Sequence, residues 1–234
     1  YLQPDANHAL AQGVWDAATQ QRLALDASQI SEDLHHAWYT EADDSRPRHP
    51  TNGLTQPDPD KAGAYTWNKA PRLAGQVVET GAIARQLVDG QPLMRDACAL
   101  YGGTVLTRVL ARLLELARIL PMMEQWLMAL QANAPFHQVQ AMPEQSQGAG
   151  LSEAARGALG HWLRIDKGRI AHYQIVAPTS WNFSPRDAAG TPGALEMALV
   201  GAPVDAASTD GPGTSVAVQH IVRSFDPCMV CTVH

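Results

Sequence analysis

The chain has 234 residues, a formal net charge of −6 at pH 7, and 45% hydrophobic residues. This length is sufficient for one large domain or two small ones with a buried core. The acidic balance argues against a nucleic-acid partner, because phosphate binding requires clustered Lys and Arg, and no segment approaches the ~20 uninterrupted apolar residues of a membrane span.

The N-terminal third predicts one weak helix and one long connection. The chain opens on YLQPDANHAL without an initiator Met or the pattern of a signal peptide, so we expect an internal piece of a longer chain. From Tyr1 to about Gln29 the pattern is loosely helical. Residues 45–65 are rich in Pro, Gly and Asp, which predicts a long irregular connection that wraps over another surface.

The strongest helical pattern runs from about Pro92 to Gln131. Apolar residues at helical spacing form one stripe, which predicts a face buried in the core: Leu106, Val109, Leu110, Leu113, Ala117 and Leu120. The polar face, expected to be solvated, carries Arg108, Arg112, Glu115 and Arg118. Pro121 should kink the helix or divide it in two.

The character of the chain changes at His161. The segment HWLRIDKGRIAHYQIVAPTSWNF predicts two short strands with Lys167-Gly168 as their hairpin turn. A short helix is expected near residues 193–200, a turn-rich surface connection at 203–214, and a last helix or turn at SVAVQHIVRSF. We therefore expect a mainly α protein with a small β element (α+β).

The last seven residues, CMVCTVH, contain two of the three cysteines. Two thiolates at this spacing can hold one soft or borderline metal ion, such as Ni, Fe, Cu(I) or Zn. A structural zinc site needs four ligands, and Cys98 lies in an apolar helical stretch that favours a buried, inert thiol. A redox dithiol would be expected to open a helix after a strand. Half of a metal site completed by ligands upstream of Tyr1 is the third interpretation, and the spacing alone leaves all three open.

The residues around this motif extend the pattern. The stretch SFDPCMVCTVH resembles the C-terminal signature of the large subunit of nickel–iron hydrogenases, Asp-Pro-Cys-x-x-Cys-x-x-His. Further stretches resemble blocks of that family in its order: WYTEA after SEDLHHA, YTWNKAPRLAG, EAARGALGHW and IVAPTSWNFSPRDAAGTPGALEMALVGAPV. The resemblance covers nearly the whole chain from about Ser31 and is closest to the uptake-type and sensor-related branch. It implies that residues 1–234 are the C-terminal portion of a single large-subunit domain.

The resemblance implies a nickel–iron centre for reversible heterolytic cleavage of H2, physiologically in the direction of H2 uptake. Cys228 matches the terminal nickel ligand, which we also expect to be the proton-accepting base, and Cys231 matches the thiolate that bridges nickel and iron. A second Cys-x-x-Cys in the N-terminal part of the same large subunit would complete the nickel site. The iron would carry carbon monoxide and cyanide, and electrons would leave through iron–sulfur clusters of a small-subunit partner.

Six further residues match family positions around this centre. His234 matches a ligand of a magnesium or similar ion, which would also take the backbone carbonyl of Ile175. Thr179 matches a hydroxyl that donates to one cyanide, with Pro178 packed beside it.

The remaining two matches are charged residues. Arg156 matches an arginine over the open coordination site, where a rigid, permanently charged guanidinium would assist H2 splitting. Asp226 matches the carboxylate expected to form a salt bridge with Arg156.

One position departs from the family pattern. Ala155 stands where the family usually has Pro, and because Pro fixes φ, we expect a looser loop around Arg156. His36 and His161 lie beside aromatic residues in the sequence and are interpreted as hydrogen-bonded core histidines rather than ligands.

Two alternative functions remain open at this stage: an H2-sensing regulatory subunit with the same site, and a zinc-stabilised structural module. In the family a maturation protease commonly removes a tail after the motif's His, so an end at His234 is expected for a processed chain. Sensing members made without a tail would end in the same way. A cytoplasmic protein and one that meets a membrane only indirectly, as a peripheral protein, are both compatible with the sequence.

Overall fold

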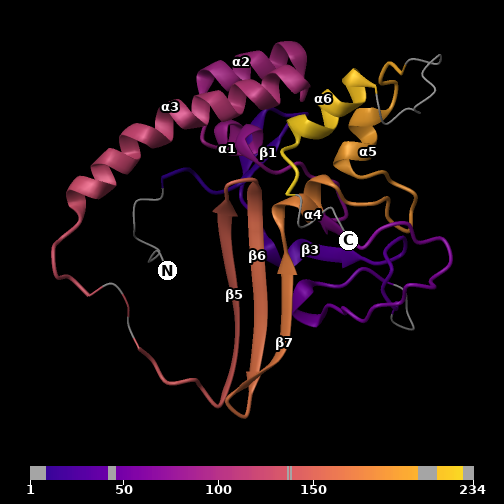
Figure 1. The fold of residues 1–234 in the computed structure, drawn as a ribbon, viewed down its shortest axis with the longest axis vertical. Helices are drawn as coiled ribbons and strands as arrows, with labels where there is room; N and C mark the ends of the chain where they lie inside the picture. The colour runs from indigo at the N-terminus through magenta and orange to yellow at the C-terminus, as the bar shows by residue number, and fades with distance from the viewer. Residues whose placement is uncertain (1–8, 42–45, 136, 138, 205–214, 229–234) are drawn as a thin grey trace.

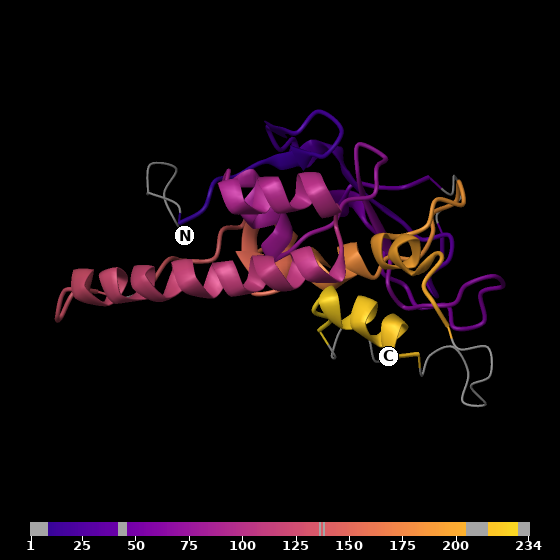
Figure 2. The same ribbon diagram turned by 90° about the horizontal axis from the view of Figure 1, so that it is seen from above.

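A computed structural model describes residues 9–41, 46–135, 137, 139–204 and 215–228 (Figures 1 and 2). The α-helices are α1 (Ala82–Val88), α2 (Pro92–Tyr101), α3 (Val105–Ala129), α4 (Pro178–Asn182), α5 (Ala194–Leu199) and α6 (Val216–Ser224). The strands are β1 (Val14–Asp16), β2 (Gln21–Leu23), β3 (Ile30–Asp33), β4 (Ala70–Leu73), β5 (Gln145–Ala154), β6 (Gly157–Asp166) and β7 (Arg169–Val176).

The described residues form a mixed α+β fold in which neither class dominates. The strands pair antiparallel as β1–β2, β3–β4 and β5–β6–β7. The prediction of an α+β fold is confirmed, but the expected helical dominance is not found, because six α-helices stand beside seven strands in the described part. No helix within that part is long and apolar enough to cross a bilayer.

The predicted N-terminal helix is wrong for the residues described, from 9 onward. This segment forms the β1–β2 hairpin. The carboxylate of Asp16 accepts hydrogen bonds from the backbone N of Ala18 at 2.9 Å and from the hydroxyl of Thr19 at 2.8 Å. Such side-chain bonds to neighbouring groups favour a turn over a helix.

The long connection before Tyr65 is confirmed over its described residues, 46–65. Its one regular element there is a short 3₁₀ turn at Pro50–Asn52. The connection lies against β7, because Thr55 Oγ1 donates to Gln174 Oε1 at 2.8 Å. It therefore covers the sheet, as expected of a long ordered loop.

The strong helical pattern is confirmed, although its division was misplaced. The break falls at residues 102–104, where the chain turns and Thr104 is the N-cap of α3. Thr104 and Thr107 cap this start reciprocally, with Thr104 N donating to Thr107 Oγ1 at 2.8 Å. Pro121 does not divide the helix, since α3 runs unbroken from Val105 to Ala129.

Most of the apolar stripe of α3 is exposed, so the prediction that it is core is wrong for the described chain except at Leu110, which packs against the α1–α3 core. Leu106, Leu113 and Leu120 are each about three-fifths exposed, whereas Arg108 is 6% exposed and Ala111 is fully buried. The physical reason is the direction of packing. The charged side of α3 contacts α1 and α6. The C-terminal half of the helix projects beyond the neighbouring helices (Figures 1 and 2).

The predicted hairpin at Lys167-Gly168 is confirmed, with Asp166 paired to Arg169. Both turn residues have positive φ, 53° and 65°, as the two-residue turns of twisted hairpins require. The third strand, β5, was not predicted, because its sequence QSQGAGLSEA lacks the β-branched and aromatic residues typical of strands. The predicted helices near 193–200 and before Phe225 are confirmed as α5 and α6.

Two small cores hold these elements together. Ala82, Ile83, Leu87, Met94 and Ala111 pack between α1, α2 and α3. A second cluster lies between β3, β6, β7 and α4 and consists of Ile30, Trp162, Val176 and Trp181. Helix α4, the hairpin tip between β5 and β6, and the end of α6 meet between the two cores (Figure 1).

Candidate metal centre

The residue Cys228 follows a tight turn at the end of α6. Helix α6 ends at Ser224, and Asp226 has φ of +53°, which turns the chain sharply before Pro227. The backbone N of Cys228 donates to Thr179 Oγ1 at 3.1 Å. Thr179 is 2% exposed and lies in the first turn of α4, where Pro178 occupies the N1 position. The turn therefore places the Cys228 backbone against the start of α4.

Arg156 reaches the same place from the hairpin tip between β5 and β6. Its Nε lies 3.7 Å from Asp226 Oδ1, and both side chains are about 45% exposed. The two residues also line one pocket together with Glu79, Thr80 and Gly81. The sequence-predicted residues Arg156 and Asp226 are thus brought together across 70 positions of the chain.

Residues 79–81 pack between α4 and the hairpin tip. The side-chain amide of Asn182 accepts from Thr80 N at 2.9 Å and donates to Thr80 O at 3.0 Å. Gly157, with φ of +136°, lies so close that a Cβ there would be 2.5 Å from Thr80 Oγ1. Only a glycine at position 157 allows the tip to approach this closely.

Helix α3 holds the end of α6 through charged side chains that the sequence did not identify as part of a site. Arg112 Nη1 donates to Ser224 O at 2.6 Å, which satisfies a carbonyl at the C-terminus of α6. The guanidinium of Arg108 lies over the ring of Phe225, 3.7 Å from its centroid, and bonds both carboxylate oxygens of Glu79 at 2.7 and 2.9 Å. Their spacing of four residues on one face was the available signal, but it is also the pattern of a solvated helix face.

Three further residues were predicted as metal ligands. Cys231 and His234 lie outside the described residues. Ile175 is in β7, paired with His161 of β6, and is 49% exposed. Within the described ranges no three His, Cys, Asp or Glu side chains converge.

The histidines interpreted as hydrogen-bonded core residues are hydrogen-bonded, but they are half-buried in the described chain rather than in its core. His161 Nδ1 is 2.6 Å from Tyr173 Oη, and His36 Nδ1 is 3.1 Å from Gly63 O; both contacts are exposed. The thiol of Cys98 packs beside the α1–α3 core, and burial together with the nearby Glu79 carboxylate raises its pKa. This agrees with the predicted inert thiol.

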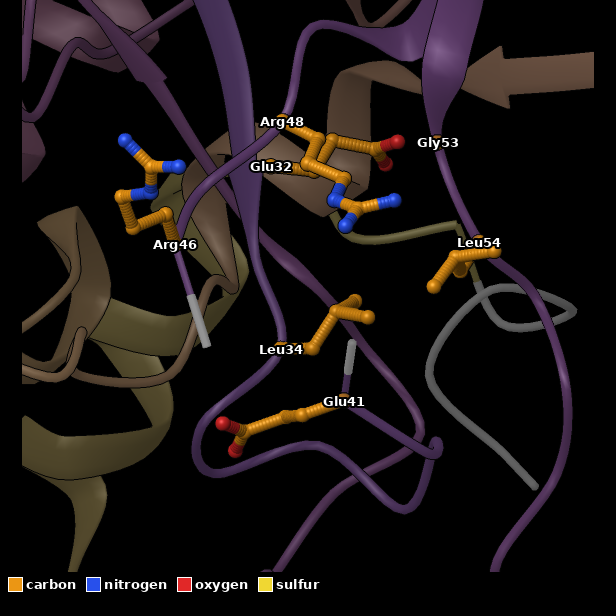
Figure 3. Close-up of a pocket in the computed structure, with 7 residues that line it drawn as sticks. All are labelled: Glu32, Leu34, Glu41, Arg46, Arg48, Gly53 and Leu54. Atoms are coloured by element: carbon orange, nitrogen blue, oxygen red, sulfur yellow. The ribbon is translucent and has the colours of Figure 1, made fainter. Parts of the chain in front are cut away.

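A separate pocket lies beneath the long connection, lined by Glu32, Leu34, Glu41, Arg46, Arg48, Gly53 and Leu54 (Figure 3). Glu32 is 5% exposed, and burial raises the pKa of its carboxyl although Lys69 Nζ lies 3.5 Å away. Burial likewise lowers the pKa of Lys69. Charges of both signs line this pocket (Figure 3), so we assign it to packing of the connection over β3 rather than to a ligand.

Comparison with known proteins identifies the family. The model of the family described as nickel-dependent hydrogenase matches residues 2–234. The chain belongs to this family. It is 33% identical to the uptake hydrogenase large subunit of Afipia carboxidovorans over 90% of this chain and 42% of that relative. It is 34% identical to the hydrogenase-1 large chain of Citrobacter freundii, covering 89% of this chain and 40% of the relative.

Solved structures show the same relationship to the hydrogenase family. The Ni-Fe-Se hydrogenase from D. vulgaris Hildenborough in the reduced state superposes with a TM-score of 0.85 at 33% identity, over 99% of this chain and 50% of that one. The described fold is therefore the fold of part of a hydrogenase large subunit. The chain spans less than half the length of the curated relatives it matches.

The donor chemistry at the site fits the nickel that this family requires. Cys228 is part-buried, and the backbone N–H of the same residue donates to Thr179 Oγ1. A thiolate is a soft ligand suited to nickel. Its loop is held by α4 on one side and by α3 on the other, which orients a ligand before the metal binds.

Proposed function

We propose that this chain is the C-terminal portion, residues 1–234, of a single large-subunit domain of a nickel–iron hydrogenase. The proposed activity is reversible heterolytic cleavage of H2, physiologically H2 uptake, with electrons passed to an iron–sulfur small subunit. The observation that carries the proposal is the convergence of Cys228, Thr179, Arg156 and Asp226 from three separate segments.

The ligands of the proposed centre come from the two ends of the domain. Cys228 and Cys231 would bind nickel, with Cys231 shared with an iron that carries carbon monoxide and cyanide; the N-terminal part of the domain would add a second thiolate pair. His234 and the carbonyl of Ile175 would bind a magnesium ion. When bound, the nickel–iron centre supplies a Lewis-acidic, redox-active site at which H2 is polarised.

The side chains of this segment have distinct roles in the proposed reaction. The thiolate sulfur of Cys228 accepts the proton released from H2, because it is basic and adjacent to the reacting atoms. Thr179 holds the backbone of that cysteine, and Pro178 fixes the first turn of α4. Arg156 supplies a permanent positive charge over the site, and Asp226, whose Oδ1 lies 3.7 Å from Arg156 Nε, adds a weak ion pair to it.

The experiment that tests this function uses the complete enzyme and the variant Arg156→Lys. We expect H2-dependent reduction of an artificial electron acceptor to fall about 10²–10³-fold, because lysine keeps the charge but loses the planar, preorganised donors of the guanidinium. Nickel content should be unchanged, since Arg156 is not a ligand. Unchanged turnover would overturn the role of Arg156. Zinc in place of nickel in the complete enzyme, or bound nickel without turnover, would overturn the proposed H2 uptake.

A further inference from the structure

The ion pair between Arg156 and Asp226 is too weak to fix the arginine by itself. Both side chains are nearly half exposed, and the closest approach is 3.7 Å. Exposed pairs of this kind contribute ~0–1 kcal/mol. The direction of Arg156 must therefore be determined mainly by its backbone at the hairpin tip.

A buried arginine of α1 lies directly under that tip. Arg85 is 7% exposed, and its guanidinium has five N–H groups. Two of them bond the two carboxylate oxygens of Glu115, both at 2.7 Å, and a third bonds Glu153 at 2.8 Å. The remaining two donate to the carbonyl oxygens of Ala154 and Ala155, both at 3.0 Å. Each of its five donors is matched by one of these contacts.

The two carbonyls that Arg85 binds are those immediately before Arg156 in the chain. Each carbonyl belongs to a rigid peptide plane. Holding the carbonyls of Ala154 and Ala155 therefore fixes the two planes that lead into Arg156. We propose that Arg85 is the positioning residue for Arg156, acting through the backbone of residues 154–155; the functional importance of this role rests on the function proposed above. Glu115 of α3 holds the guanidinium from the other side and thereby connects the tip to the long helix.

The residue at position 155 explains why this support matters. Ala155 and Arg156 form the two-residue loop between paired Ala154 and Gly157, and neither loop residue has positive φ. Alanine leaves φ free, whereas proline is favoured at the second position of such turns because it fixes φ. The sequence of this turn does not restrain its own backbone, so the restraint comes from Arg85 of α1.

Lysine cannot replace Arg85 in this role. A lysine has one nitrogen with three donors, so it cannot reach Glu115 and both carbonyls at once. In the complete enzyme, Arg85→Lys should raise hydrogen–deuterium exchange at residues 155–158 by about tenfold, because local opening becomes easier. Turnover should fall about 10–100-fold, as expected for a misplaced catalytic group, while nickel content is retained.

The matched control is Arg118→Lys. Arg118, in α3, likewise bonds groups of the facing segment, with Nη1 2.6 Å from the buried Gln86 Oε1 and Nη2 2.5 Å from Asp89 Oδ2, but no hydrogen bond joins it to the tip. We expect no change in exchange at residues 155–158 in this control. Should Arg85→Lys fail to accumulate, Glu115→Gln keeps the packing and weakens the hold on Arg85, and it should raise exchange at the tip by a smaller factor.

A second-site rescue separates positioning from general stability. In the double variant Arg85→Lys/Ala155→Pro, the proline should restore low exchange at the tip and most of the turnover, because it restrains the same turn directly. Unchanged exchange in Arg85→Lys, equal loosening of α1 and α3 with loss of nickel, or absence of rescue would overturn the proposal. Normal turnover in Arg156→Lys would instead overturn the proposed role of Arg156, and the exchange data would still test whether Arg85 fixes the backbone of the tip.

Discussion

Replacing Gly157 by alanine should push the hairpin tip away from the proposed centre. The new Cβ would lie 2.5 Å from Thr80 Oγ1, 2.9 Å from Thr80 Cβ and 2.7 Å from Gly81 N. Thr80 cannot move aside easily, because Asn182 binds both its N–H and its carbonyl. Overpacking of this kind costs about 1–3 kcal/mol, and φ of +136° adds about 1–3 kcal/mol of backbone strain for a residue with a side chain.

The assay for Gly157→Ala combines thermal unfolding, nickel content and turnover of the complete enzyme. We expect a loss of about 2–6 kcal/mol in unfolding free energy from the two costs above, and lower turnover because Arg156 moves with the tip. Gly148→Ala on β5 is the matched control: a Cβ there meets no atom within 4 Å, so its effect should be small. Equal stability and turnover in the two variants would refute the argument that the tip depends on close approach.

Two further substitutions test a hydrogen bond of the site and an ion pair elsewhere in the fold. Thr179→Val removes the acceptor for Cys228 N and should cost about 1–3 kcal/mol and lower nickel content, whereas Thr179→Ser should retain nickel; equal nickel in both would contradict the role of this hydroxyl. Partial burial alone would raise the pKa of Asp187, but hydrogen bonds from Thr191 N and Arg72 outweigh it and hold that pKa below its ordinary value of 3.8. The resulting stabilisation is present above pH 3.8 and is lost as the pH falls through the lowered folded-state pKa. Asp187→Asn should therefore lower the midpoint of thermal unfolding at neutral pH, and the difference from the unaltered protein should shrink below pH 3.8. A difference that does not change with pH would contradict this assignment.

Local features were predictable where one residue type decides the backbone. Lys167-Gly168 predicts a hairpin turn, and both residues have the positive φ that the turn needs. The N-terminal hairpin was missed because its turn depends on bonds made by the Asp16 side chain, which outweigh a weak helical pattern. Strand β5 was missed because pairing with β6, rather than its own residues, makes it a strand.

The positions of α3 side chains could not be predicted, because burial depends on which elements pack against the helix. Its apolar stripe suggested a core face and its arginines a solvated one, yet Arg108 is buried against Phe225 while Leu113 is exposed. The role of Arg85 could not be predicted for the same reason, because no sequence pattern distinguishes a buried arginine whose five N–H groups all find acceptors. The sequence motifs predicted Arg156, Asp226, Thr179 and Cys228 as site residues, and the structure adds the side chains that hold their backbones.

The central claim is that Cys228 binds nickel, and the nickel content of the complete enzyme tests it most directly. Serine is a poor ligand for a soft metal, so Cys228→Ser should lose most of the bound nickel. Cys98→Ser is the matched control, because Cys98 lies in α2 beside the apolar core, and this variant should bind nickel as the unaltered enzyme does. Full nickel content in Cys228→Ser would contradict the account.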